Sequence, residues 1–266
     1  MIYDLQKASV LKRISAAILD LILVLIFATG AFFALSSILN YDSLMDDMGE
    51  HYDKYEETYK FEEQFDIRFE EITQADREKN KELDALYKEA YEVARNDKEL
   101  LKTKSQIMSM TLLMLTSGIL IAILINDFVI PLFLKNGQTV GKKLFGICLI
   151  MDDGTKVRKL PLFIRALLGK FTIETMLPFY AFYLLMFGTG SFTLVAFFLA
   201  VAMMIANILL IIIDKRNLLI HDAMAFTITV DKNSQMIFET KADMMKYIEE
   251  NTKKKVNSQK TLGNKK

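Results

Sequence analysis

Five polar side chains lie inside long apolar stretches of this sequence. They are three carboxylic acids and two amides, namely Asp20, Asn126, Asp127, Glu174 and Asn207. Four of them lie seven to nine residues from the charged residue at the nearer end of their stretch, which on a helix is a depth of about 10–13 Å. Glu174 lies near this depth or closer to the surface, according to where its helix begins. A carboxylate inside a membrane usually faces a bundle interior or a water-filled cavity. The group therefore predicts a cation or proton site, unless each side chain only hydrogen-bonds neighbouring helices together.

A second group of polar residues follows the second apolar stretch. It consists of Gly137, Gln138, Thr139, Gly141 and Lys142. A phosphate-binding loop has four residues between its glycines and a Ser or Thr after the lysine, and this sequence has neither. Nucleotide binding is not expected, and the glycines predict a tight reversal of the chain at the membrane surface.

The remaining reactive residues do not form a recognisable catalytic or metal site. His221 and Asp222 resemble half of a hydrolytic dyad, but no Ser or Cys nucleophile motif accompanies them. We expect Asp222 instead to satisfy backbone donors or Arg13. His51 stands alone among acids and Cys148 is the single cysteine, too little for a metal site or a disulfide framework. The sequence predicts no enzyme activity, cofactor or metal.

Four apolar stretches approach or exceed the roughly 20 helical residues needed to cross a bilayer core. They cover about 14–39, 107–134, 171–187 and 192–213. The approach to the third, at 160–170, is either an interfacial amphipathic helix or the first turns of the span. A tight turn at 188–191 predicts that the last two spans form an antiparallel pair. The first stretch is too long for the apolar core of a cleaved signal peptide.

Basic residues gather on the flanks that share one side of this arrangement, although the chain as a whole has a net charge of zero. Lys12 and Arg13 precede the first span, the 135–159 loop carries six basic and two acidic residues, and the tail after the fourth span opens with Lys-Arg. Lys and Arg are enriched in cytoplasmic loops, so both ends and this loop are predicted to be cytoplasmic. Segment 41–106, with 20 acidic and 11 basic residues, is then extracytoplasmic.

The 41–106 segment has the apolar period of helices rather than of a linker. Apolar residues recur mostly at three- or four-residue intervals on both sides of 73–76, where Thr73 or Asp76 is expected to act as a helix N-cap. We predict a helical hairpin that folds back near 72–77 with its apolar stripes packed on each other. Docking of a partner protein on the aromatic stripe is the alternative.

Two short apolar stretches outside the spans are predicted to be strands. One lies within 144–151, before the turn signal Asp153-Gly154, and the other ends the stretch 223–230 in alternating Thr, Ile and Val. We expect them to pair beneath the bilayer. From Lys253 onward the tail has no apolar period; it is predicted to be disordered and free to rest on anionic headgroups.

Three stretches together resemble the RDD family of bacterial membrane proteins. They are Arg13 to Asp20, Gly137 to Ile147 with the acidic turn at 152–154, and His221 to Val230. The family is named after one Arg and two Asp, which the resemblance places at Arg13, Asp20 and Asp222. It covers about 10–40 and 107–231, and so implies that the hairpin is an insertion between the first two spans. The family has no agreed activity, although cation/proton exchange has been suggested for some members.

These features predict an all-α transmembrane fold: a four-helix membrane bundle with an extracytoplasmic helical hairpin and a small cytoplasmic β element. The parts are a terminal segment with the first span (1–40), the hairpin (41–106), a membrane region of three spans and a loop (107–231), and the tail (232–266). The expected function is a small transporter of cations or protons in a bacterial plasma membrane. The alternative is a non-enzymatic partner or assembly protein that binds another envelope component through its hairpin. The expected partner of the protein is the lipid bilayer, and no nucleic-acid partner is expected. Four helices rarely enclose a pathway alone, so a transporter of this size would favour assembly as a homo-oligomer; the oligomeric state itself is left open.

Overall fold

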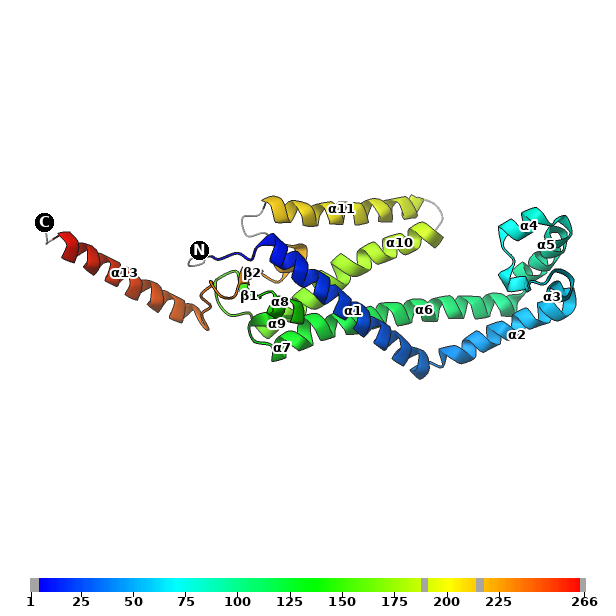
Figure 1. The fold of residues 1–266 in the computed structure, drawn as a ribbon, viewed down its shortest axis with the longest axis horizontal. Coiled ribbons are helices and arrows are strands. Elements are labelled where there is room, and N and C mark those ends of the chain that lie inside the picture. Colours follow the sequence, from blue (N-terminus) through cyan, green and yellow to red (C-terminus); the bar gives the residue numbers. More distant parts are fainter. Residues whose placement is uncertain (1–4, 188–190, 214–217, 264–266) are drawn as a thin grey trace. The chain divides into compact units, whose positions relative to one another are not determined.

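The computed structural model describes residues 5–187, 191–213 and 218–263, and the chain forms two compact units (Figure 1). The first unit consists of the chain up to Thr29 and from Ile119 onward, and the second is Gly30–Gly118. The first unit contains most of the residues that the sequence marks as chemically interesting. The second contains most of the charged segment that was predicted to be a hairpin.

Two helices have the length and composition of membrane spans. They are α1 (Val10–Ile38) and a continuous helix that runs from α6 (Lys98–Leu124) through the π-helical segment η2 (Ile125–Val129) to α7 (Ile130–Phe133). Large apolar side chains on α1 are exposed, and Ile18, Leu21 and Leu25 each leave more than half of their surface uncovered. Because an apolar helix with an uncovered face is costly in water, lipid is the natural cover for this surface.

The third and fourth apolar segments are helical but do not pass the same test among the described residues. The third runs without a break through α9 (Lys159–Ile164), the π-helical segment η4 (Arg165–Met176) and α10 (Leu177–Phe187). The stretch 160–170 therefore forms the first turns of this helix. Charged residues in η4 lower its apolar character. The fourth segment, α11 (Ser191–Ile213), packs beside α10 (Figure 1). That these two helices cross the membrane stays a prediction.

A two-stranded antiparallel sheet confirms the predicted strand pairing. Strand β1 (Ile147–Met151) pairs with β2 (Thr227–Asp231), with Leu149 opposite Thr229. A five-residue helix precedes each strand, α8 (Val140–Leu144) before β1 and α12 (Ile220–Met224) before β2. The sheet buries the side chains of Cys148, Ile150, Ile228 and Val230. It fixes the positions of α8 and α12, which carry several of the candidate site residues.

The second unit is helical, as its apolar period predicts, but the helices are short. After α2 (Tyr41–Tyr59) come α3 (Phe61–Phe65), the 3-10 turn η1 (Phe69–Glu71), α4 (Gln74–Lys79) and α5 (Lys81–Asn96). Lys60 and Asp66 have left-handed backbones, with φ of 55° and 56°, and end α2 and α3. Thr73 is the N-cap of α4 and forms a capping box with Asp76. The extracytoplasmic position of this unit stays a prediction.

Aromatic rings form the centre of the second unit. The ring of Phe69 lies 5.5 Å from those of Tyr55 and Phe61 and 5.4 Å from that of Tyr87, measured between centroids. Phe61 is fully buried. The apolar positions of 41–106 therefore pack on each other, which was the simpler of the two interpretations of the aromatic stripe.

The tail differs from the prediction of disorder. Helix α13 (Lys241–Gly263) continues through the residues after Lys253. This stretch contains Lys, Gln and Leu but no proline, so its residues favour or tolerate a helix. The missing apolar period shows only that no helix face needs to be buried, and it does not exclude a helix.

Candidate functional site

Buried polar and charged side chains gather in the first unit, contributed by α1, α8, η2, η4 and α12. Those that are less than 9% exposed include Asp20, Asn126, Asp127, Thr139, Lys142, Arg165, His221 and Asp222. Because charged groups are costly to bury without partners, the hydrogen bonds among them decide what the site can do.

Asp222 is the centre of a buried ion-pair group. Its carboxylate is fully buried and accepts from Arg13 Nη2 at 3.2 Å and from Arg165 Nε at 3.0 Å. The structure thus joins two of the three family-motif residues, Arg13 and Asp222, through α1 and α12. Arg165 is the partner that the sequence analysis missed.

His221 extends this group from α12 to Glu174 on η4. Arg165 Nη2 lies 2.7 Å from His221 Nε2, and His221 Nδ1 lies 2.7 Å from a Glu174 oxygen. Arginine can only donate, so Nε2 accepts and the Nδ1 proton is donated to Glu174. Burial, and then the charges of Arg165, Lys170, Lys142 and Arg13, hold the pKa of His221 well below its usual 6.5. The imidazole is therefore neutral, as these hydrogen bonds require.

Asp20 contacts the loop between α7 and β1 rather than the other carboxylates. One oxygen accepts from the Thr139 hydroxyl at 2.5 Å and the other from the Gly141 N–H at 2.9 Å. A Cβ at Gly141 would overlap the Ala16 carbonyl oxygen and lie 2.8 Å from the Asp20 carboxylate. Gly141 is therefore needed for the close approach of α8 to α1.

The rest of the cytoplasmic loop motif shapes the same connection. Gly137 has a φ of 62° and reverses the chain, as predicted. Gln138 donates to the Ile147 carbonyl at 2.8 Å, and Thr139 caps α8 by accepting from the Lys142 N–H. These contacts hold the Lys142 side chain inside the unit.

Asp127 forms an ion pair within the second span. Its carboxylate is 1% exposed and lies 2.5 Å from the Lys170 ammonium, while the Asn126 amide donates to its other oxygen at 3.2 Å. The carbonyl oxygen of Asn126 is itself buried and has no hydrogen-bond partner among the described residues. This orphan oxygen lies beside a carboxylate and a lysine.

Both π-helical segments carry site residues. Asn126 and Asp127 lie in η2, and the segment η4 contains Arg165, Lys170 and Glu174. In η4 the hydroxyls of Thr172 and Thr175 bond to carbonyls five residues back. π-Helical segments are rare and often occur at functional sites. Here they turn charged side chains of two apolar helices toward each other.

A cavity of about 90 Å³ lies within this cluster. Its lining includes Arg13, Asp20, Lys142, Arg165, Lys170 and His221. Of the five residues predicted to form one acidic layer, only Asp20 lines it. Asp127 and Glu174 are bonded to Lys170 and His221, and the side chain of Asn207 lies outside the described residues. The expected layer is thus a set of separate contacts, in which Lys170 neutralises Asp127, while Asp20 and Glu174 accept hydrogen bonds from neutral donors.

Arg165 and Lys170 are the site residues that the sequence analysis did not include. Both precede the predicted start of the third span at 171 and were assigned to its flank. The signal that was available is the need of buried carboxylates for partners: the two cations lie on the same helix as Glu174, at nine and four residues before it.

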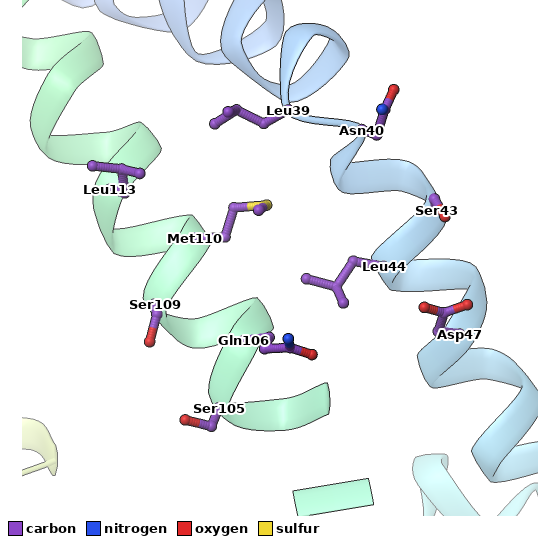
Figure 2. A pocket seen from close by; sticks show the side chains of 10 residues that line it. All are labelled: Leu39, Asn40, Ser43, Leu44, Asp47, Ser105, Gln106, Ser109, Met110 and Leu113. Atoms are coloured by element: carbon purple, nitrogen blue, oxygen red, sulfur yellow. The ribbon is translucent and has the colours of Figure 1, made fainter. Parts of the chain in front are cut away.

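The second unit has a groove between α2 and residues 105–113 of α6 (Figure 2). Its volume is about 510 Å³. Leu44 and Met110 point toward each other across the groove (Figure 2). The hydroxyl of Tyr41 lies 2.8 Å from that of Thr111 near this groove.

Two apolar helices of membrane length, whose surfaces are mostly uncovered, together with the family match to residues 7–225 indicate an integral membrane protein. The chain belongs to the RDD family, whose sequence model matches residues 7–225. The matched range includes 41–106, and that this segment is an insertion between the first two spans stays a prediction. Comparisons with curated proteins and with solved structures found no significant match.

Proposed function

We propose that this protein is a small transporter that exchanges a monovalent cation for a proton at Asn126, Asp127 and Lys170. The observation that carries the proposal is the unpartnered Asn126 carbonyl oxygen beside the Asp127 carboxylate. Leaving a buried acceptor unpaired costs about 1–3 kcal/mol. Carboxylate and amide oxygens are ligands that alkali and alkaline-earth cations prefer, so a cation bound there would satisfy the orphan oxygen.

The Asp127–Lys170 pair supplies a way to couple the cation to a proton. In the resting pair, the ammonium and the carboxylate neutralise each other at 2.5 Å. When a cation binds Asp127, Lys170 is displaced and releases one proton, so the site stays neutral. The Lys170 side chain is 23% exposed and therefore has access to solvent for this release. The exchange is one cation for one proton and makes no covalent change in a substrate, so we propose no enzyme activity.

The composition of the site favours a monovalent ion. Among the described residues there is no group of three His, Cys, Asp or Glu side chains that could hold a metal. One carboxylate and one amide are fewer ligands than a resident divalent ion requires. Asp20 is not proposed as a ligand, because both its oxygens already accept hydrogen bonds.

Proton movement driven by sodium or potassium in liposomes tests the proposal. We expect Asp127→Asn to abolish exchange. Asn126→Leu should raise the KM for the cation about tenfold or more, equivalent to about 1.4 kcal/mol; because it also removes the hydrogen bond to Asp127, thermal unfolding checks that the variant is folded. Asp231→Asn is the control, since the Lys12–Asp231 pair has the same 2.5 Å separation but is more exposed. Exchange that persists in Asp127→Asn, or an unchanged KM in Asn126→Leu, would exclude this site.

A second candidate function is that of a partner protein that binds another envelope component. The observation that favours it is the groove of about 510 Å³ between α2 and α6. Leu44→Asp would place a charge in the groove, whereas Met45→Asp, at an exposed neighbouring residue that does not line the groove, would place one outside it. Loss of function in cells with the first variant and not the second, while ion exchange by the purified protein is unchanged, would favour this function over transport.

A further inference from the structure

Lys142 is a buried basic residue of the cluster with no hydrogen-bond or ion-pair partner for its ammonium among the described residues. The Lys142 side chain belongs to a residue that is only 6% exposed, and in the described part of the chain its ammonium takes part in no hydrogen bond or ion pair. The nearest acids bond elsewhere, Asp20 to Thr139 and Gly141 and Asp127 to Lys170. A charge with so little exposure and no ion-pair partner is unfavourable, and the position favours an unusual protonation state, water in the cavity that Lys142 lines, or an anion there.

The cavity that Lys142 lines is predominantly cationic. Arg13, Arg165 and Lys170 line it too, and Asp20 is the single acid among its lining residues. Arg165 bonds to Asp222 and His221 through two of its nitrogens, and a guanidinium has five N–H donors in all. The walls therefore offer several donors and positive charge, and little that would bind a cation.

The size of the cavity restricts the ligand. Its volume of about 90 Å³ is several times the roughly 10–15 Å³ needed for one water. It is well below the roughly 300–1,000 Å³ of sites for larger metabolites. One small tetrahedral group fits this range, whereas a nucleotide or sugar does not.

We propose that this cavity is an oxyanion site, in which Lys142 is the principal ligand and Arg13, Arg165 and Lys170 complete the shell. The ligand is a phosphate-type group, either a free inorganic oxyanion or the phosphate of a lipid headgroup. The site goes beyond cation/proton exchange: it shares Lys170 with that mechanism, but its principal ligand Lys142 has no part there, and binding is measured without transport.

Binding is expected to depend on pH through Lys142. Burial, and then Arg165 and Lys170 on η4, lower its pKa to about 7, against the opposing charges of Asp127 on η2 and Asp20 on α1. Two further groups line the same cavity, Arg13 on α1 and the neutral His221 on α12. Lysine carries its charge below its pKa, so an anion that needs the charged form binds about tenfold more weakly at pH 8 than at pH 6.

The test is calorimetric titration of the purified full chain in detergent with sulfate, which has no titration near neutral pH, and with chloride at equal ionic strength. We expect sulfate to bind the wild type, more tightly at pH 6 than at pH 8. Lys142→Met should weaken binding at least about tenfold, whereas Lys143→Met, a change at the adjacent exposed lysine of α8, should leave it unchanged. Removing an unpaired buried charge should not impair folding, and Lys142→Gln serves as a second variant.

A second arm distinguishes the two sources of the anion. The protein is transferred to nanodiscs that contain phosphatidylglycerol, and bound phospholipid is counted by native mass spectrometry. Sulfate binding with no specifically retained phospholipid identifies a free oxyanion. One phospholipid retained by the wild type and Lys143→Met, but lost in both Lys142 variants, identifies a headgroup. Equal sulfate binding and equal phospholipid retention in all variants would overturn the proposal.

Discussion

Replacing Asp222 by Asn tests whether the buried ion-pair group holds the first unit together. The change keeps the size of the side chain but removes the negative charge between Arg13 and Arg165. Asp222 is fully buried, and Arg13 and Arg165 leave 12% and 3% of their side chains exposed. Removing one partner of a buried ion pair costs about 3–5 kcal/mol, because the remaining charge is left without compensation. With about 2–4 °C per kcal/mol for a chain of this size, Tm should fall by roughly 6–20 °C.

The matched control is Asp231→Asn, which breaks the Lys12–Asp231 pair. That pair is closer, at 2.5 Å, but its side chains are 43% and 19% exposed. Exposed pairs contribute about 0–1 kcal/mol, so its Tm should change by only a few degrees. Both variants are measured by thermal unfolding in the same detergent. A Tm for Asp222→Asn within about 2 °C of the wild type, or an equal loss in both variants, would refute the argument from burial.

Three further predictions follow from single positions. Gly141→Ala should destabilise the first unit by about 3 kcal/mol, because its Cβ would overlap backbone and disturb the Asp20 hydrogen bond. By contrast, Gly49→Ala, in a helix with nothing within 4 Å of the new Cβ, should stabilise by about 0.5–1 kcal/mol in denaturant titrations. The pKa of His221 is lowered in the folded state, so as the pH falls the unfolded state takes up the proton first. The free energy of unfolding should therefore decrease below pH 6.5 by up to about 1.4 kcal/mol per pH unit. The same dependence of stability on pH in His221→Gln would contradict this. Cysteines are introduced one at a time at the exposed positions Glu57 and Glu239 and treated with a membrane-impermeant thiol reagent outside intact cells. The cysteine at 57 should react and the cysteine at 239 should not; reaction at 239 would contradict the predicted orientation.

The sequence predicts the elements of this fold well where the signal is local. The strand pairing of 147–151 with 227–231 and the cap at Thr73 follow from short patterns. The breaks at Lys60 and Asp66 do not, because left-handed backbones at residues other than glycine have no reliable signal.

Burial also changes how orientation must be tested. The native Cys148 would be a natural reporter of the cytoplasmic side, but it is fully buried in β1, and burial raises the pKa of its thiol to about 11. A thiol of this kind reacts slowly from either side. Orientation therefore has to be tested at exposed positions.

The site was predicted less completely than the fold, because ion-pair partners are set by contacts across the chain. Asp222 and Arg165 are 57 residues apart, and Asp127 and Lys170 are 43 apart. The carboxylates stood out because they interrupt apolar stretches. Their partners Arg165 and Lys170 did not, since lysine and arginine at the edge of a span are usually membrane-surface anchors. The shift to π-helical hydrogen bonding in η4 also leaves no pattern in the apolar residues.

The balance of charge in the cluster links the proposed exchange to the proposed anion site. With His221 neutral, the cluster has four carboxylates and four basic side chains: Asp20, Asp127, Glu174 and Asp222 against Arg13, Lys142, Arg165 and Lys170. A cation that enters adds one charge in a region where charge is costly, and neutrality returns when a lysine loses its proton. An anion that enters has the opposite effect and favours the protonated form of Lys142. The two ligands have opposite charges, so each should favour the other, and saturating sulfate should strengthen cation binding in the wild type but not in Lys142→Met.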